Sequence, residues 1–125
     1  MAHNNAPPSP PQIRLVYASH TPEDIILKTE LDALSVVHRN FKVLYIVTQP
    51  GEGAWRGATG HVSKDMITSF LPPPQPEAGR HGVLVCGPPG FMKAVSGEKK
   101  SQSEQGELTG MLAELSYSAA QTFKF

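Results

Sequence analysis

The stretch Val83-Leu84-Val85-Cys86-Gly87-Pro88-Pro89-Gly90-Phe91-Met92 predicts a strand, a sharp turn and the start of a helix. Its first four residues have the length and β-branched content of a strand buried on both faces, as in a parallel sheet. Gly87 permits a tight turn and close approach of the backbone to a ligand, and Pro89 suits the first position of a helix. Cys86 therefore stands at the carboxyl end of a strand, where open α/β sheets bind their ligands.

A strand, a helix and a second strand are predicted before this turn. Residues 13–18 and 41–47 are short, mostly apolar runs that are typical of β-strands. Thr21-Pro22-Glu23-Asp24 predicts a helix start, because threonine caps helices, proline fits the first turn and acids favour the positive end of the helix dipole. Leucines continue at helical spacing from Leu27, and residues 38–40 predict the helix end. This order predicts a parallel strand pair joined by a right-handed crossover.

The remaining segments complete an α/β pattern. Residues 48–60 are rich in glycine and turn-forming residues, which predicts an irregular segment. Residues 63–70 predict a short helix, and residues 107–116 place leucine and methionine on one face of an amphipathic helix. A last strand is predicted at residues 122–125.

Length and composition limit the class of protein. A chain of 125 residues fits one domain, and 11 basic against 11 acidic side chains favour neither nucleic acid nor an anionic membrane as a partner. One cysteine excludes an internal disulfide and fits a reducing compartment. No apolar run approaches the ~18 residues of a membrane span, and the histidines lack metal-ligand spacing. Residues 1–12 are polar and proline-rich and predict a disordered leader, which leaves the domain to residues 13–125.

Two residues have more than one reading. Cys86 is a buried small side chain, a nucleophile activated by the following helix, or a thiol that lines a cofactor pocket without reacting. Covalent catalysis also needs a general base, which no pattern here supplies. Thr48 is a turn residue or a contact to the adenosine ribose, since it ends the second predicted strand. An acid at that position accepts from the 2′-hydroxyl and repels a 2′-phosphate, whereas threonine does only the first.

Residues 83–92 closely resemble the Cys-Gly-Pro-Pro signature of flavin-dependent, NAD(P)H-oxidising reductases. The family comprises NADH–cytochrome b5 reductases and the reductase domain of nitrate reductases. The resemblance extends over residues 13–125 and includes Trp55-Arg56-Gly57 and the ending Phe123-Lys124-Phe125. That ending is most similar to fungal mitochondrial cytochrome b5 reductases.

The resemblance implies a ferredoxin-reductase-like NAD(P)-binding lobe, with a Rossmann-like parallel sheet that lacks its first strand. In the family's strand order, 3-2-1-4-5, the first strand is central. We therefore expect its two neighbours to have unpaired edges. The flavin-binding barrel and the Gly-Gly-Thr-Gly-Ile-Thr-Pro loop of the family do not occur in this sequence either.

The resemblance also implies a hydride-transfer site that uses NADH and, in the whole reductase, FAD. Thr48 stands where the family commonly has Asp or Asn, so NADPH is not excluded. Cys86, the catalytic candidate, is placed beside the nicotinamide and flavin, where it orients rather than reacts. The implied cofactor-binding residues are Gly87, Pro88 and Pro89 for the nicotinamide ribose and Ser19, His20, Thr48 and His61 for the adenosine half. No metal site is implied.

Three functions are compatible with the sequence. The first is a portion of a cytochrome b5 reductase type oxidoreductase, inactive alone, which in whole form passes electrons to a haem protein such as cytochrome b5. For it the resemblance implies the mitochondrial outer membrane or intermembrane space, with no membrane segment in this chain. The second is a non-catalytic remnant that serves as a nucleotide-binding or interaction module. The third is a cysteine-dependent enzyme built on Cys86.

Overall fold

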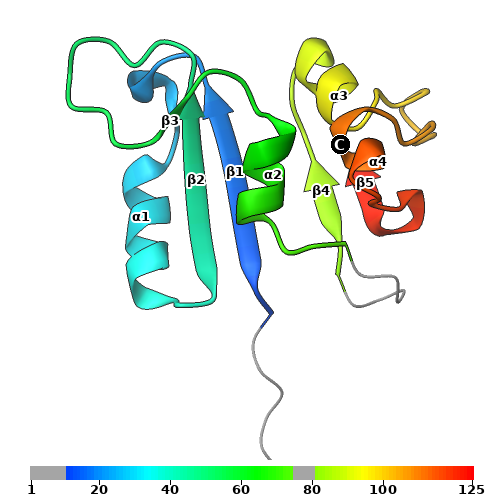
Figure 1. The fold of residues 1–125 in the computed structure, drawn as a ribbon, viewed down its shortest axis with the longest axis horizontal. Coiled ribbons are helices and arrows are strands. Elements are labelled where there is room, and N and C mark those ends of the chain that lie inside the picture. Colours follow the sequence, from blue (N-terminus) through cyan, green and yellow to red (C-terminus); the bar gives the residue numbers. More distant parts are fainter. Residues whose placement is uncertain (1–10, 75–80) are drawn as a thin grey trace, which may run out of the picture. The chain divides into compact units, whose positions relative to one another are not determined.

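The computed structural model describes residues 11–74 and 81–125, whose helices and strands are drawn in Figure 1. Contacts divide the chain into two compact units, a first unit at residues 1–61 and a second unit at residues 62–125. Strands in both units pair in parallel and alternate with helices, which confirms the predicted α/β class. The leader predicted at residues 1–12 lies outside the described residues, apart from its last two.

A three-stranded parallel sheet forms the first unit. It contains β1 (Ile13–Ser19), β2 (Phe41–Val47) and β3 (Ala58–Thr59) in the order β1-β2-β3. β1 and β2 pair along their whole length, up to Ser19 opposite Val47. The strands predicted at these two places are confirmed, whereas β3 was missed because two residues are too few to show a period. In the described sheet β1 has a partner on one side only.

The helix predicted from Thr21 onward is not continuous. The structure has a 3-10 turn, η1 (Pro22–Asp24), and then the helix α1 (Lys28–Val37), which begins four residues after the turn. Leu27, just before α1, has a φ of 66°, in the left-handed region that ends or interrupts helices. The prediction of one helix from Thr21 is therefore wrong, while its second part is confirmed.

The core of the first unit explains this interruption. Ile25, Tyr45 and Val47 are buried together, so the chain after η1 turns inward to place Ile25. The backbone N–H of Ile26 then donates to the hydroxyl of Tyr17 at 3.1 Å. Because this donor is satisfied by a side chain, the segment does not need a helical hydrogen bond at that position.

A polar network connects α1 to β2. The hydroxyl of Tyr45 donates to Asp32 at 2.7 Å, and Lys28 pairs with the same carboxylate at 2.7 Å. The hydrogen bonds from Lys28 and Tyr45 lower the pKa of Asp32, while burial and Asp32 raise the pKa of Tyr45. The stabilisation by Asp32 is thus present above its ordinary pKa of 3.8 and is lost as the pH falls through the lower folded-state value.

The second unit has a two-stranded parallel sheet. β4 (Val83–Val85) pairs with β5 (Thr122–Lys124), with Val83 opposite Thr122 and Val85 opposite Lys124. The predicted strands at both places are confirmed. The other described elements of this unit are α2 (Lys64–Phe70), α3 (Pro89–Val95), α4 (Gly110–Glu114) and the 3-10 turn η2 (Ala119–Gln121).

β4 is less buried than the sequence predicts. Val85 is 5% exposed, but its neighbour Leu84 is 71% exposed on the opposite face. Because successive side chains of a strand point to opposite faces, one face of β4 is packed and the other is open. The prediction of a strand buried on both faces is therefore wrong for the described chain.

α4 covers the centre of the helix predicted at residues 107–116. Gly110 at its start has a φ of 71°, and a side chain there would lie 2.5 Å from the carbonyl oxygen of Ala94 in α3. This close approach and left-handed backbone stop the helix from extending toward residue 107. Leu112, one of the predicted apolar-face residues, is 1% exposed.

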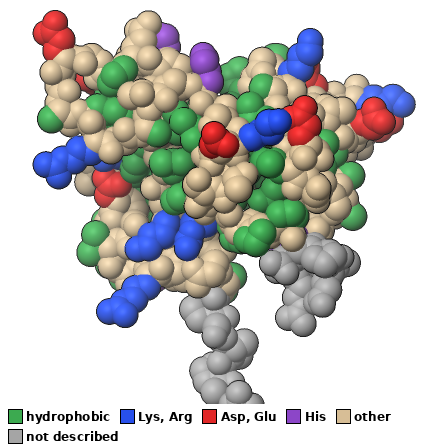
Figure 2. Space-filling view, in the orientation of Figure 1, with side chains coloured by type: hydrophobic (Ala, Val, Ile, Leu, Met, Phe, Trp, Pro, Cys, Tyr) green, Lys and Arg blue, Asp and Glu red, His purple; other side chains and the backbone are tan. Residues whose placement is uncertain are grey.

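Figure 2 shows acidic and basic side chains spread over the visible face of the molecule. Both signs therefore occur on one surface, as the equal counts of 11 basic and 11 acidic residues allow. Among residues 11–74 and 81–125, no helix is both long and apolar enough to cross a membrane.

Leu112→Ala tests the packing of the second unit. Leu112 is 1% exposed, so its truncation leaves a cavity and is expected to lower the free energy of unfolding by ~2–5 kcal/mol. Leu84→Ala is the matched control, because Leu84 is 71% exposed and its truncation should cost less than ~1 kcal/mol. Chemical denaturation followed by circular dichroism measures both, and equal losses would contradict the packing described.

Candidate functional site

The carboxyl ends of β1 and β2 bring three of the predicted site residues together. The backbone N–H of Thr48 donates to the carbonyl of Ser19 at 3.2 Å, and the N–H of Gln49 donates to the carbonyl of His20 at 2.8 Å. Parallel pairing thus continues one step beyond both strands. Ser19, His20 and Thr48 consequently form one row at the edge where α/β sheets bind ligands.

His61 lies at the same edge through β3. The register pairs Val47 with Thr59, and the N–H of Gly60 donates to the carbonyl of Val47 at 2.9 Å. His61 follows directly and is exposed. The four residues predicted for the adenosine half therefore all belong to the first unit and to one end of its sheet.

The side chains of Thr48 and His20 are in direct contact. Oγ1 of Thr48 lies 2.9 Å from Nδ1 of His20 and 3.2 Å from the carbonyl oxygen of the same residue. A hydroxyl has one proton, so it donates to one of these groups only. Both contacts are made together when the hydroxyl donates to the carbonyl and His20 carries a proton on Nδ1. Thr48 then retains one acceptor lone pair and bears no charge.

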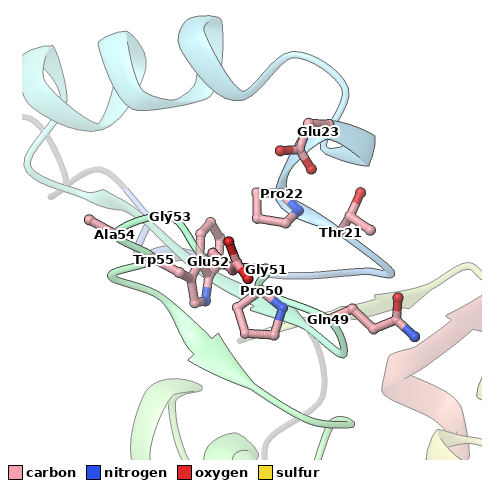
Figure 3. A pocket seen from close by; sticks show the side chains of 10 residues that line it. All are labelled: Thr21, Pro22, Glu23, Gln49, Pro50, Gly51, Glu52, Gly53, Ala54 and Trp55. Carbon is pink, nitrogen blue, oxygen red and sulfur yellow. The ribbon is translucent and has the colours of Figure 1, made fainter.

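A cavity of about 320 Å³ lies beside this row. Its volume falls near the lower end of small-molecule sites, which begin at ~300 Å³. Figure 3 shows that its walls come from η1 and from the loop that follows β2. Pro22, Pro50 and Trp55 give it apolar surface, and Glu23 and Glu52 give it carboxylates. The full lining is residues 21–23 and 49–55.

Trp55 has a structural role in this cavity. Its indole N–H donates to the carbonyl of Ala58 at 2.9 Å, and its ring packs against the buried core of the first unit. At Gly57 a side chain would lie 2.4 Å from the Trp55 ring, so only glycine leaves room for it. The loop after β2 is thereby held against the sheet, although the sequence predicts it only as irregular.

The Cys-Gly-Pro-Pro turn belongs to the second unit. Cys86 directly follows β4 and has an exposed thiol, so its reading as a buried small side chain is wrong. Pro89 is the first residue of α3, as the sequence predicts, and Pro88 precedes it as the N-cap residue. A side chain at Gly87 would lie 2.4 Å from the ring of Phe91, so only glycine allows the backbone of the turn to approach this ring so closely. The readings of Cys86 as a nucleophile and as a pocket-lining thiol stay open.

Lys124 is a residue that the sequence reasoning missed. It is 2% exposed, and its ammonium group donates to the backbone carbonyls of Glu98, Gln105 and Glu107 at 3.3, 3.0 and 2.6 Å. Gln105 also accepts from the backbone N–H of Lys124 and donates to its carbonyl. Lys124 in β5 lies opposite Val85 in β4, the residue before Cys86. The hydrogen bonds of Lys124 therefore fix β5, which pairs with the strand that leads into the turn.

A signal for Lys124 was present in the sequence. Phe123 and Phe125 flank it in a predicted strand, and strand residues alternate between faces. If the two phenylalanines share one face, Lys124 occupies the other. The structure shows that this other face is the packed one, since Phe123 is 48% exposed and Phe125 is 62% exposed.

Parallel strands joined through helices, with polar groups and a cavity at their carboxyl ends, are typical of α/β domains that bind nucleotides. Comparison with known proteins agrees with this class. Residues 1–97 match the family described as Oxidoreductase NAD-binding domain. The chain therefore belongs to the oxidoreductase NAD-binding domain family.

Full-length relatives extend well beyond this chain. NADH-cytochrome b5 reductase 2 of Scheffersomyces stipitis is 47% identical over 115 residues, which cover 91% of this chain and 37% of that protein. NADH-cytochrome b5 reductase-like protein of Arabidopsis thaliana is 45% identical over 114 residues, which cover 91% of this chain and 34% of that protein. The chain thus spans little more than a third of the relatives it matches.

Solved structures support the predicted fold. The cytochrome b5 reductase domain of Ulva prolifera nitrate reductase has a TM-score of 0.71 and 28% identity, over 91% of this chain and 37% of that one. The CS-b5R domains of human Ncb5or, at 23% identity and a TM-score of 0.69, share the fold over 91% of this chain and 28% of that one. The prediction of a ferredoxin-reductase-like NAD-binding lobe is confirmed.

Gly87→Ala tests the tightness of the Cys-Gly-Pro-Pro turn. The new methyl group overlaps the Phe91 ring, and this overpacking is expected to cost ~1–3 kcal/mol and to change the alkylation rate of Cys86. Gly90→Ala, in the first turn of α3, is the matched control because no atom lies within 4 Å of its added methyl. Denaturation and iodoacetamide labelling give the two readouts. A turn that tolerates both changes equally would refute the geometry.

Lys124→Met tests the hydrogen bonds that fix β5. Loss of the ammonium group leaves three backbone carbonyls without their donor, so the free energy of unfolding should fall by more than ~2 kcal/mol. Lys93→Met is the control, since Lys93 is exposed on α3 and its replacement should change stability by less than ~0.5 kcal/mol. Thermal and chemical denaturation measure the difference, and similar values for the two variants would exclude this role of Lys124.

Proposed function

We propose that this chain is the nicotinamide-nucleotide-binding portion of a FAD-dependent oxidoreductase of the cytochrome b5 reductase type. The observation that carries the proposal is the row of Ser19, His20 and Thr48 at the carboxyl ends of paired parallel strands, in a chain of the NAD-binding oxidoreductase family. Relatives at 45–47% identity named as NADH-cytochrome b5 reductases support the choice of nucleotide and reaction.

The first unit fits the adenosine half of NADH. Thr48 and His20 present a hydroxyl and an imidazole at the sheet edge, and Ser19 and His61 lie on the same edge. The cavity beside them combines proline and tryptophan surface with polar groups, a mixture suited to a base and a ribose. In this assignment the four residues bind and orient the nucleotide and take no part in bond making.

The second unit carries the residues that we assign to the nicotinamide half of the nucleotide. Cys86 is exposed directly after the end of β4. Gly87, Pro88 and Pro89 then form the tight turn that leads into α3. We assign the thiol an orienting role and the turn the shaping of the nicotinamide-ribose pocket. In the whole reductase, bound NADH and FAD would supply the redox chemistry, which is hydride transfer from NADH to FAD followed by single-electron transfer to a haem protein such as cytochrome b5.

The flavin is assigned to a part of the reductase other than these 125 residues. The Arg-x-Tyr-Ser/Thr motif of the family's flavin-binding barrel does not occur in the sequence. The ending Phe123-Lys124-Phe125 is similar to that of fungal mitochondrial cytochrome b5 reductases. On this basis we propose that the protein is located in the mitochondrial outer membrane or intermembrane space.

The proposal predicts that the purified chain binds NADH without oxidising it. Thr48→Val keeps the shape of the side chain and removes the hydroxyl, so NADH affinity in calorimetry should fall ~3–10-fold. Thr68→Val, on the exposed side of α2, is the matched control and should leave affinity unchanged. NADH oxidation is also assayed with ferricyanide as the electron acceptor, and no turnover is expected. Absence of NADH binding, or turnover by chain that retains FAD, would contradict the proposal.

A further inference from the structure

The residue directly after the end of β2, Thr48, is uncharged, so the proposed adenosine site has no acidic group at this position. In dinucleotide-binding folds an acid at this position accepts from the ribose 2′-hydroxyl and repels a 2′-phosphate. Thr48 accepts only weakly, and its hydroxyl is already in contact with His20 at 2.9 Å. From the strand end alone, the site would not distinguish NADH from NADPH.

Two carboxylates stand beside the strand ends instead. Glu23 comes from η1, which follows β1, and Glu52 comes from the loop that follows β2. Both line the cavity whose other walls include Thr21 and Gln49, the residues next to His20 and Thr48 in the sequence. Figure 3 shows the two carboxylate groups on facing sides of this cavity.

Both carboxylates lack a charge partner among the described residues. Within residues 11–74 and 81–125, neither Glu23 nor Glu52 takes part in an ion pair or a side-chain hydrogen bond. The next acid along, Asp24, is occupied by the backbone and hydroxyl of Thr21. Arg56, the basic residue closest to Glu52 in sequence, does not line the cavity. The cavity therefore has a negative lining.

We infer that Glu23 and Glu52 make the site selective for NADH over NADPH, in place of the acid that Thr48 replaces. The inference rests on the proposed function, which puts the adenosine ribose at the ends of β1 and β2. A 2′-hydroxyl can donate to a nearby carboxylate, whereas a 2′-phosphate brings like charge toward two of them. The charged groups that determine nucleotide selectivity are thus in the segments that follow the strands, and not at the end of β2.

The size of the effect follows from Coulomb repulsion. Two carboxylates within about one Debye length (~10 Å at 0.1 M salt) of a phosphate, in the high dielectric of an exposed site, change its affinity by up to about tenfold. The contribution is screened by salt, because the Debye length falls from ~10 Å at 0.1 M to ~3 Å at 1 M. Selectivity that comes from these charges should therefore shrink as the ionic strength rises.

The test compares two probes on the purified 125-residue chain, ADP-ribose and 2′-phospho-ADP-ribose, by calorimetry. The unaltered chain should bind ADP-ribose about tenfold more tightly. The double variant Glu23→Gln, Glu52→Gln should gain about tenfold for the phosphorylated probe and change little for ADP-ribose. Glu30→Gln, at an exposed acid on α1 that does not line the cavity, is the control for the loss of a negative charge outside the cavity.

A rescue variant links the loop acids to the strand end. Thr48→Asp added to the double variant should restore selectivity for ADP-ribose, because it returns the charge to the end of β2. An unchanged ratio of the two affinities in the double variant, or the same change in Glu30→Gln, overturns this inference alone. Failure of the chain to bind either probe overturns the proposed function, and this inference with it.

Discussion

The parallel pairing of β1 with β2 is the interaction on which the first unit depends. Seven residues of each strand are in register, so their ends coincide at Ser19 and Val47. His20 and Thr48 then leave the sheet together and meet at 2.9 Å. A shift of one residue would send every side chain to the other face of the sheet and would separate this pair.

The core of the first unit fixes that register. Tyr45 and Val47 are buried from β2, and Ile25 reaches the same core from the segment after η1. Burying Ile25 interrupts the helix that the sequence favours, and this interruption places η1 beside the cavity. The position of Glu23 at the cavity is therefore a consequence of the burial of Ile25, two residues further along the chain.

In the second unit a buried cation plays the comparable part. Lys124 satisfies three carbonyls of the segment between α3 and α4 while its own backbone is held by Gln105. A buried ammonium group is tolerated only when its donors are paired, as they are here. The backbone N–H of Phe125 further donates to the carbonyl of Val85 at 2.9 Å, directly before Cys86. The exit of β4 is thus held from one side by β5.

Most elements of the fold could be predicted from local pattern. Short strand-like runs predicted β1, β2, β4 and β5, and Pro89 predicted the start of α3. β3 could not be predicted, because its two residues are strand only through pairing with β2. The break at Leu27 was equally hidden, since it results from the burial of Ile25 and a hydrogen bond from Tyr17.

The sequence by itself determined the α/β class, the family resemblance and the identity of the candidate site residues. These depend on periodicity, turn chemistry and short motifs, which are local properties of the chain. Tertiary structure alone decided that Thr48 contacts His20, that Lys124 is buried, and that Glu23 and Glu52 line one cavity. Each of these facts joins residues 17 to 29 positions apart, and only strand pairing and core packing bring such residues together.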